Sequence, residues 1–138
     1  LDPILPARPG HGKEQILLLD DELSIANMSG KALERFGYKV NIQTDPVEAL
    51  AHFKSKPDFF DLVISDMAMP NMTGTDFVRK IRDVRNDIPV IICTGHSPLI
   101  DETRAREMDI DLLLTKPVEK QVLADAVRQV LDIRSGKY

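Results

Sequence analysis

Short segments rich in strand-forming residues alternate with helix-type segments along almost the whole of this 138-residue chain. Most of the strand-type segments are apolar throughout, as in Leu17-Leu18-Leu19 and Val90-Ile91-Ile92. A strand without polar positions needs cover on both faces, and helices packed on the two faces of a parallel sheet provide it. We therefore expect strands over residues 16–19, 38–43, 61–65, 90–93 and 111–114.

The intervening segments carry helix signals. Asp45 followed by Pro46 matches a capping residue and a first-turn proline, while Gly37 is typical of the position beyond a helix end. Near the C-terminus, apolar residues form one stripe at helical spacing. The expected helices cover residues 23–36, 46 to about 54, a segment that Thr75 caps, a segment that begins at Ser97–Pro98, and a last segment around 122–131.

Strands that alternate with helices in this way predict an α/β fold. Right-handed crossovers favour a flavodoxin-like, doubly wound, five-stranded parallel sheet with strand order 2-1-3-4-5 and five helices. We expect this domain over residues 15–133. Residues 1–14 are rich in proline and glycine and are typical of a flexible linker or tail, and residues 134–138 form a short C-terminal tail.

Charge and apolar content argue against several classes of partner. With 18 Lys and Arg against 22 Asp and Glu, the net charge is −4, and no basic run favours nucleic acid or an anionic membrane. The longest apolar runs are far shorter than the roughly 20 residues that cross a bilayer. Cys93 is the single cysteine and lies in an apolar run, which indicates a buried thiol. We expect a cytoplasmic protein that is a monomer or a weak homodimer.

The ends of the expected strands carry the polar residues best placed for chemistry. Asp20 and Asp21 follow the first strand, Asp66 the third, Thr94 the fourth and Lys116 the fifth. Ligands of such sheets bind outside the carboxyl ends of the strands, near the point where the strand order reverses. We therefore expect these side chains to share one edge of the sheet.

That set of side chains suits phosphoryl transfer. Clustered carboxylates repel one another and favour a hard dication such as Mg²⁺, with Mn²⁺ as an alternative. One carboxylate can then attack a phosphoryl group as a nucleophile. A lysine and a hydroxyl stabilise the charge on the phosphoryl oxygens, so catalysis consists of positioning and electrostatics.

Four motifs resemble the CheY-like receiver domains of response regulators in two-component systems. They are Ile-Leu-Leu-Leu-Asp-Asp-Glu at 16–22, Leu-Val-Ile-Ser-Asp-Met-Ala-Met-Pro-Asn-Met-Thr-Gly at 62–74, Ile-Ile-Cys-Thr-Gly at 91–95 and Thr-Lys-Pro at 115–117. Each motif alone is weak, but their order and spacing together are specific. The resemblance extends from Gln15 to Ile133.

The resemblance implies a phosphoacceptor and a metal site. Asp66 becomes the phosphorylated residue. Asp21 ligates Mg²⁺ directly and Asp20 mostly through water, while Asp66 and the backbone carbonyl of Ala68 complete the protein ligands. The small side chain of Ala68 also leaves room for access to the phosphoryl group.

The resemblance also implies a switch. Thr94 is the hydroxyl that closes on the phosphoryl group, and Lys116 is its counter-ion, followed by a cis bond to Pro117. Leu113 occupies the switch position where the family usually carries Tyr or Phe, so a leucine must repack there instead of a ring. His96 is expected at the rim, where it tunes access.

The implied function is phosphorelay signalling. A histidine kinase or a histidine phosphotransfer protein would phosphorylate the domain, and the surface around the fifth strand and the last two helices would change. A downstream protein or an output within the same chain would read that change. The domain would promote its own phosphorylation and dephosphorylation without being a conventional enzyme. The Pro/Gly-rich tail and the start at Leu1 resemble a receiver at the C-terminus of a hybrid sensor histidine kinase.

Other interpretations remain for the single residues. Asp20 and Asp21 alone could cap a helix, Asp66 alone could be a turn residue, and Lys116 alone could be a solvated lysine. The capping of a helix would also explain the hydroxyl of Thr94.

Three rival functions use related chemistry or the same fold. A haloacid-dehalogenase-type hydrolase places its nucleophile after the first strand and a second Asp two positions later. In this chain Asp66 follows the third strand, and Ala68 stands two positions later. A flavin module needs a phosphate-binding loop after the first strand, where Asp20 and Asp21 would repel FMN. A degenerate receiver used for docking alone stays open because of Leu113.

Overall fold

The computed structural model of the chain describes residues 10–95 and 102–136. Within these residues, five parallel strands form one sheet in the order β2-β1-β3-β4-β5, and five helices surround it. The strands are β1 (Gln15–Leu19), β2 (Lys39–Gln43), β3 (Leu62–Asp66), β4 (Val90–Thr94) and β5 (Leu112–Thr115). The helices are α1 (Leu23–Arg35), α2 (Pro46–Ser55), α3 (Gly74–Val84), α4 (Glu102–Glu107) and α5 (Lys120–Arg134). The predicted flavodoxin-like fold and strand order are confirmed.

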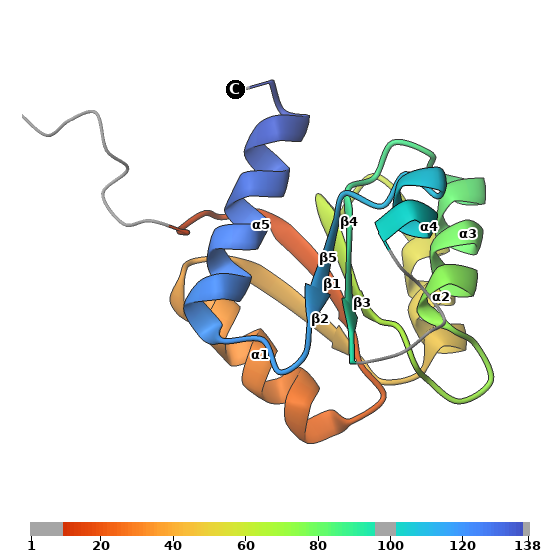
Figure 1. Ribbon diagram of the computed structural model, residues 1–138, viewed down its shortest axis with the longest axis horizontal. Helices are drawn as coiled ribbons and strands as arrows, with labels where there is room; N and C mark the ends of the chain where they lie inside the picture. The colour runs from red at the N-terminus through yellow and green to blue at the C-terminus, as the bar shows by residue number, and fades with distance from the viewer. Residues whose placement is uncertain (1–9, 96–101, 137–138) are drawn as a thin grey trace, which may run out of the picture.

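The helices cover both faces of the sheet, with α1 and α5 on one face and α2, α3 and α4 on the other (Figure 1). Strand β1 shows why its sequence is apolar at every position. Ile16 and Leu18 point into the core beneath α1 and α5, while Leu17 and Leu19 point into the core beneath the other three helices. Burying one such side chain contributes roughly 1.5–3 kcal/mol, so the two cores hold the sheet between its helix layers.

Capping residues set where two helices begin. The side chain of Asp45 accepts a hydrogen bond from the backbone N–H of Val47 at 3.0 Å, which confirms the predicted start of α2. Thr73 caps α3, and its hydroxyl accepts from the N–H of Asp76 at 3.2 Å. The prediction that Thr75 is the cap was wrong, because Thr75 already lies in the first turn and is buried there.

The predicted start of the fourth helix at Ser97–Pro98 lies outside the described residues. No helix in the described part of the chain has the length and apolarity that crossing a bilayer requires.

Residues 10–14, which we call the N-terminal strap, pack against the body of the domain although the sequence assigns them to a linker. The Gly12 N–H donates to the carbonyl of Phe36 at 3.0 Å. The buried Tyr38 hydroxyl donates to the carbonyl of Gly10 at 2.7 Å. The turn between α1 and β2 thus provides hydrogen-bond partners for backbone N–H and C=O groups of the strap.

Helix α5 holds the other side of the strap. The guanidinium of Arg128 donates to the Glu14 carboxylate at 2.7 and 3.0 Å and to the carbonyl of His11 at 3.3 Å. A Cβ atom at Gly12 would clash with this guanidinium and with the ring of Tyr38. The guanidinium can shift, but the buried ring of Tyr38 has little room to move, so a side chain at position 12 is disfavoured.

We predict that Gly12→Ala destabilises the protein by about 1–3 kcal/mol, because the added methyl group is too large for the space between the N-terminal strap, Tyr38 and α5. Urea denaturation of the two proteins measures the difference. Gly95→Ala is the control, since no described heavy atom lies within 4 Å of a Cβ placed there. Equal losses in both variants would contradict the packing of the strap.

Candidate functional site

Two acidic residues reach one edge of the sheet because β1 and β3 are neighbours that end there. Asp20 directly follows β1, and Asp66 is the last residue of β3. The chain leaves β1 toward β2 on one side, while β3 pairs with β1 on its other side. This is the point where the strand order reverses, at which ligands of open α/β sheets bind.

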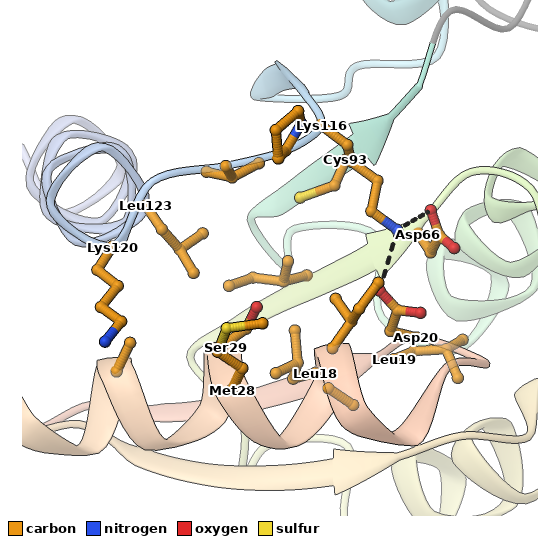
Figure 2. Close-up of a pocket in the computed structure, with 16 residues that line it drawn as sticks. Leu18, Leu19, Asp20, Met28, Ser29, Asp66, Cys93, Lys116, Lys120 and Leu123 are labelled. Carbon is orange, nitrogen blue, oxygen red and sulfur yellow. Dashed lines mark hydrogen bonds and ion pairs between the residues drawn. The ribbon is translucent and has the colours of Figure 1, made fainter.

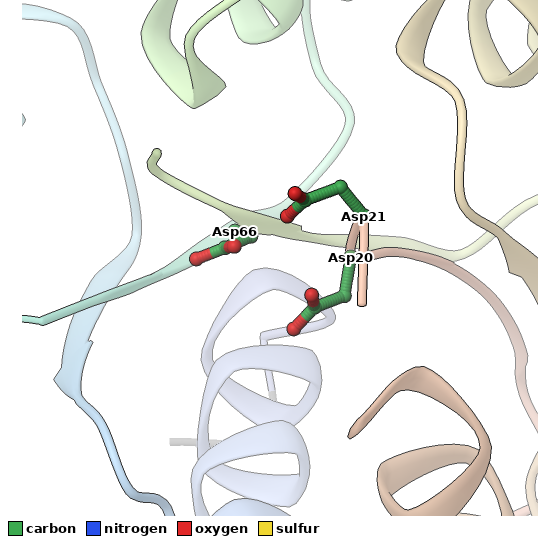
Figure 3. A group of neighbouring side chains, drawn as sticks. All are labelled: Asp20, Asp21 and Asp66. Carbon is green, nitrogen blue, oxygen red and sulfur yellow. The ribbon is translucent and has the colours of Figure 1, made fainter. Parts of the chain in front are cut away.

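Three carboxylates gather at this edge. One oxygen atom from each of Asp20, Asp21 and Asp66 lies within 4.8 Å of the others, and Figure 3 shows the side chains of the first two extending beside Asp66. Asp20 and Asp66 are both 6% exposed. Carboxylate oxygens gathered this closely are compatible with the binding of one divalent cation.

Lys116 provides positive charge to the cluster from the loop that follows β5. Its Nζ atom lies 3.2 Å from Oδ2 of Asp20 and 3.2 Å from Oδ1 of Asp66 (Figure 2). The backbone N–H of Lys116 donates a hydrogen bond to the Thr94 carbonyl at 2.7 Å, which extends the pairing of β4 with β5. The peptide bond from Lys116 to Pro117 is cis, as the resemblance implied.

The cluster holds three carboxylates and one ammonium group. Burial, together with the negative charges of Asp20 and Asp21, raises the pKa of Asp66, although Lys116 opposes this shift. Burial alone would lower the pKa of Lys116, but the hydrogen bond that its ammonium donates to Asp20 and the charges of Asp20 and Asp66 raise it overall. The lysine is therefore held in its charged form, and the acids still carry excess negative charge.

The loop after Asp66 is folded tightly against the strand end, and sequence reasoning missed this. The N–H of Gly74 donates to the carbonyl of Met67 at 2.7 Å. A Cβ at Gly74 would clash with the carbonyl oxygen of Asp66, and the Ser65 hydroxyl donates to that same oxygen at 2.9 Å. The glycine that ends the motif at 62–74 was the available signal, since close backbone approach is a common reason for a glycine.

The remaining predicted residues lie on β4, on β5 and on the loop after β3, apart from one that is not described. Thr94 ends β4 and is buried, and its hydroxyl donates to the carbonyl of Gly95 at 3.1 Å. Ala68 is exposed on the loop after β3. Leu113 is half-buried in β5 and packs against the core beneath α2, α3 and α4. His96 lies outside the described residues.

The simple capping interpretation of the acid pair does not fit. The residue that precedes α1 is Glu22, and its side chain makes no capping hydrogen bond. Asp20 does accept from the N–H of Glu22 at 2.9 Å through Oδ1, while its other oxygen faces Lys116. Asp20 therefore holds the turn before the helix and also belongs to the charged cluster.

Comparisons with known proteins agree with this geometry. The family model described as the response regulator receiver domain matches residues 16–128. The chain is 33% identical over 122 residues to the transcriptional regulatory protein GlrR of Escherichia coli K12, covering 88% of this chain and 27% of that protein. It is also 33% identical over 116 residues to the sensory transduction protein RegX3 of Mycobacterium tuberculosis H37Rv, covering 84% and 50%. The chain thus spans half or less of these curated relatives.

Solved structures give the same result. A response regulator receiver domain protein from Clostridium thermocellum is 31% identical with a TM-score of 0.84, and the match covers 91% of this chain and 99% of that one. A CheY-like receiver domain protein from Methanospirillum hungatei JF-1 is 28% identical with a TM-score of 0.82, covering 92% and 100%. In both cases the shared unit is nearly the whole of the solved chain.

We predict that Asp66→Asn stabilises the protein at pH 7 when divalent cations are removed with a chelator. The raised pKa of Asp66 means that its ionised form disfavours the folded state. This cost is absent below the pKa of the unfolded chain and appears as the pH rises through the pKa of the folded state. The gain in melting temperature should therefore shrink as the pH falls.

Thermal unfolding from pH 7 down to pH 4 measures this effect. Asp58→Asn is the matched control, because that carboxylate is exposed in the turn after α2. A lower melting temperature for Asp66→Asn at pH 7 would contradict the excess negative charge of the cluster.

Proposed function

Because this chain belongs to the receiver domains of response regulators, we propose that Asp66 is the residue through which it takes part in phosphorelay signalling. The observation that carries the proposal is the pairing of a buried, crowded Asp66 with Lys116 at 3.2 Å. The carboxylate attacks the phosphorus atom of a phosphohistidine, the bond between phosphorus and the imidazole nitrogen breaks, and an acyl phosphate forms on Asp66.

A divalent cation belongs to the proposed site. Receiver domains bind Mg²⁺ at an acidic pocket, and the oxygens of Asp20, Asp21 and Asp66 lie close enough to share one ion. The carbonyl of Ala68 is a further proposed ligand, and Mn²⁺ is an alternative ion with the same preference for oxygen. When bound, the cation screens the negative charge of the acids from the incoming phosphoryl group.

Lys116 and Thr94 stabilise the charge of the phosphoryl group in this proposal. The ammonium of Lys116 already faces Oδ1 of Asp66, so it can turn to a phosphoryl oxygen with a small movement. The Thr94 hydroxyl would exchange the carbonyl of Gly95 for another phosphoryl oxygen. Ala68 and His96 would set the access of water and partners to the acyl phosphate.

The movement of Thr94 would be the first step of the switch. Cys93 and Thr94 in β4 pair with Leu114 and Thr115 in β5, so a shift at the end of β4 reaches the neighbouring strand. Leu113 packs into the core beside α4 and is the proposed switch position. Because leucine has neither a ring nor a hydroxyl, we expect a smaller repacking than an aromatic residue would give.

The phosphoryl donor in this proposal is a histidine kinase or a histidine phosphotransfer protein. Two curated relatives are named as regulatory and sensory transduction proteins, which supports a downstream protein or an in-chain output as the recipient of the signal. A position at the C-terminus of a hybrid sensor histidine kinase is one arrangement that the segment before Gln15 would suit. A full-length reading frame tests it.

Acetyl phosphate with Mg²⁺ should phosphorylate the protein, and Asp66→Asn should remove the modification. Intact-mass spectrometry after a short incubation measures the added phosphoryl group. Asp58→Asn, which changes an exposed acid, should still be phosphorylated. If Asp66→Asn is phosphorylated to the same extent as the unmodified protein, the proposed role of Asp66 is refuted.

Mg²⁺ should raise the melting temperature, because it binds the folded site and not the unfolded chain. The expected stabilisation is roughly 2.7 kcal/mol when free Mg²⁺ is 100 times its dissociation constant. Asp21→Ala should abolish the shift. If that variant responds to Mg²⁺ as the unmodified protein does, the ion binds elsewhere.

A further inference from the structure

A cavity of about 340 Å³ lies next to the acid site, between α1, the sheet and the start of α5 (Figure 2). Its volume falls in the range of roughly 300–1,000 Å³ that is typical of small-molecule sites. The space exists because the facing side chains are small, with Ala26, Ser29 and Ala32 on α1 and Cys93 on the sheet. Most of the other side chains that line it are apolar.

The charged groups of the cavity lie at two separate ends. At one end, Asp20 and Asp66 both pair with Lys116. At the other end, the exposed Lys120 reaches from the start of α5 toward α1, and Ser29 lies on α1 between Lys120 and Asp20 (Figure 2). Among the residues that the structure describes, no hydrogen bond or ion pair engages the ammonium of Lys120 or the hydroxyl of Ser29.

We propose that this cavity binds a small amphiphilic carboxylate, with its alkyl chain between α1 and α5 and its carboxylate at Lys120. The ammonium of Lys120 is a donor that forms a charge-assisted hydrogen bond with a carboxylate. The alkyl chain would cover Leu123 and Val118, and Met28, which is 56% exposed, would close over it. A methionine adapts readily to the shape of an apolar ligand.

The charges of the cavity set the direction in which such a ligand lies. Asp20 and Asp66 repel a carboxylate from the inner end, so the anionic group stays at the outer end. Burial raises the pKa of the Cys93 thiol to about 12, so the middle of the cavity carries no charge at neutral pH. An alkyl cation of the same length would meet a positive charge at Lys120, and in protein saturated with Mg²⁺ the acids at the inner end would not be open to its ammonium either.

Binding would also affect the acid site. Pro117 and Val118 line the cavity and directly follow Lys116, so a bound chain would restrain the connection that positions this lysine. A changed rate of phosphorylation by acetyl phosphate is the expected consequence, and this part rests on the proposed function of Asp66. The binding itself does not depend on that function.

Decanoate is the probe, and chemical shifts in ¹H–¹⁵N spectra of the whole chain report its binding. Decanoate should shift the amides of Ala26, Ser29 and Lys120 in a saturable manner, both in the unmodified protein and in Asp66→Asn. Lys120→Gln should weaken its binding about tenfold, as expected for the loss of a charge-assisted hydrogen bond. Lys31→Gln, an exposed lysine on α1 outside the cavity, should have no effect.

Two further comparisons separate the outcomes. Ser29→Leu should fill the cavity and abolish binding, and in the presence of saturating Mg²⁺ decylammonium should bind at least tenfold more weakly than decanoate. Equal binding of the two amphiphiles, or unchanged binding after Lys120→Gln, would overturn the proposal. An absence of decanoate binding would also overturn it. If Ser29→Leu then accepted the phosphoryl group from a phosphohistidine protein more slowly than the unmodified protein, the cavity would be a contact surface for that partner. Normal decanoate binding with no phosphorylation of Asp66 would instead refute only the proposed function.

Discussion

The ammonium of Lys116 joins two buried carboxylates that would otherwise repel each other at the edge of the sheet. Asp20 and Asp66 come from neighbouring strands, and each is 3.2 Å from the same nitrogen atom. Burial and the negative charges of Asp20 and Asp21 raise the pKa of Asp66, although Lys116 opposes the shift. Under the proposed function, a divalent cation and then a phosphoryl group would relieve this crowding of negative charge.

The surrounding architecture serves to keep these side chains at one edge. Parallel strands deliver their carboxyl ends to the same side of the sheet, and the two apolar cores fix the strands between helices. Helix α5 contributes at its first residue and again past its middle. Lys120 lies beside the cavity close to the acid site, while Arg128 binds the N-terminal strap through Glu14. A displacement of this helix would thus reach the connection that carries Lys116 and also the strap.

The fold and the charged cluster could be predicted because they depend on repeated or local patterns. Apolar strands, the Asp45–Pro46 helix start and acids placed directly after strands each leave a signal within a few residues. The strap could not be predicted, because its composition resembles a linker and its partners, Tyr38 and Arg128, are distant in sequence. The sequence does not separate Thr73 from Thr75 as the cap of α3, because hydroxyl residues two positions apart give the same signal. The cavity depends on which small residues face each other, and no single segment contains that information.

The central claim is that Asp66 is destabilised in its ionised form until a cation binds, and titration of its carboxyl carbon by NMR measures this directly. Without divalent ions, the pKa of Asp66 should lie above the ordinary value for aspartate, and saturating Mg²⁺ should lower it. A pKa at or below the ordinary value in the chelated protein, unchanged by Mg²⁺, would contradict the claim.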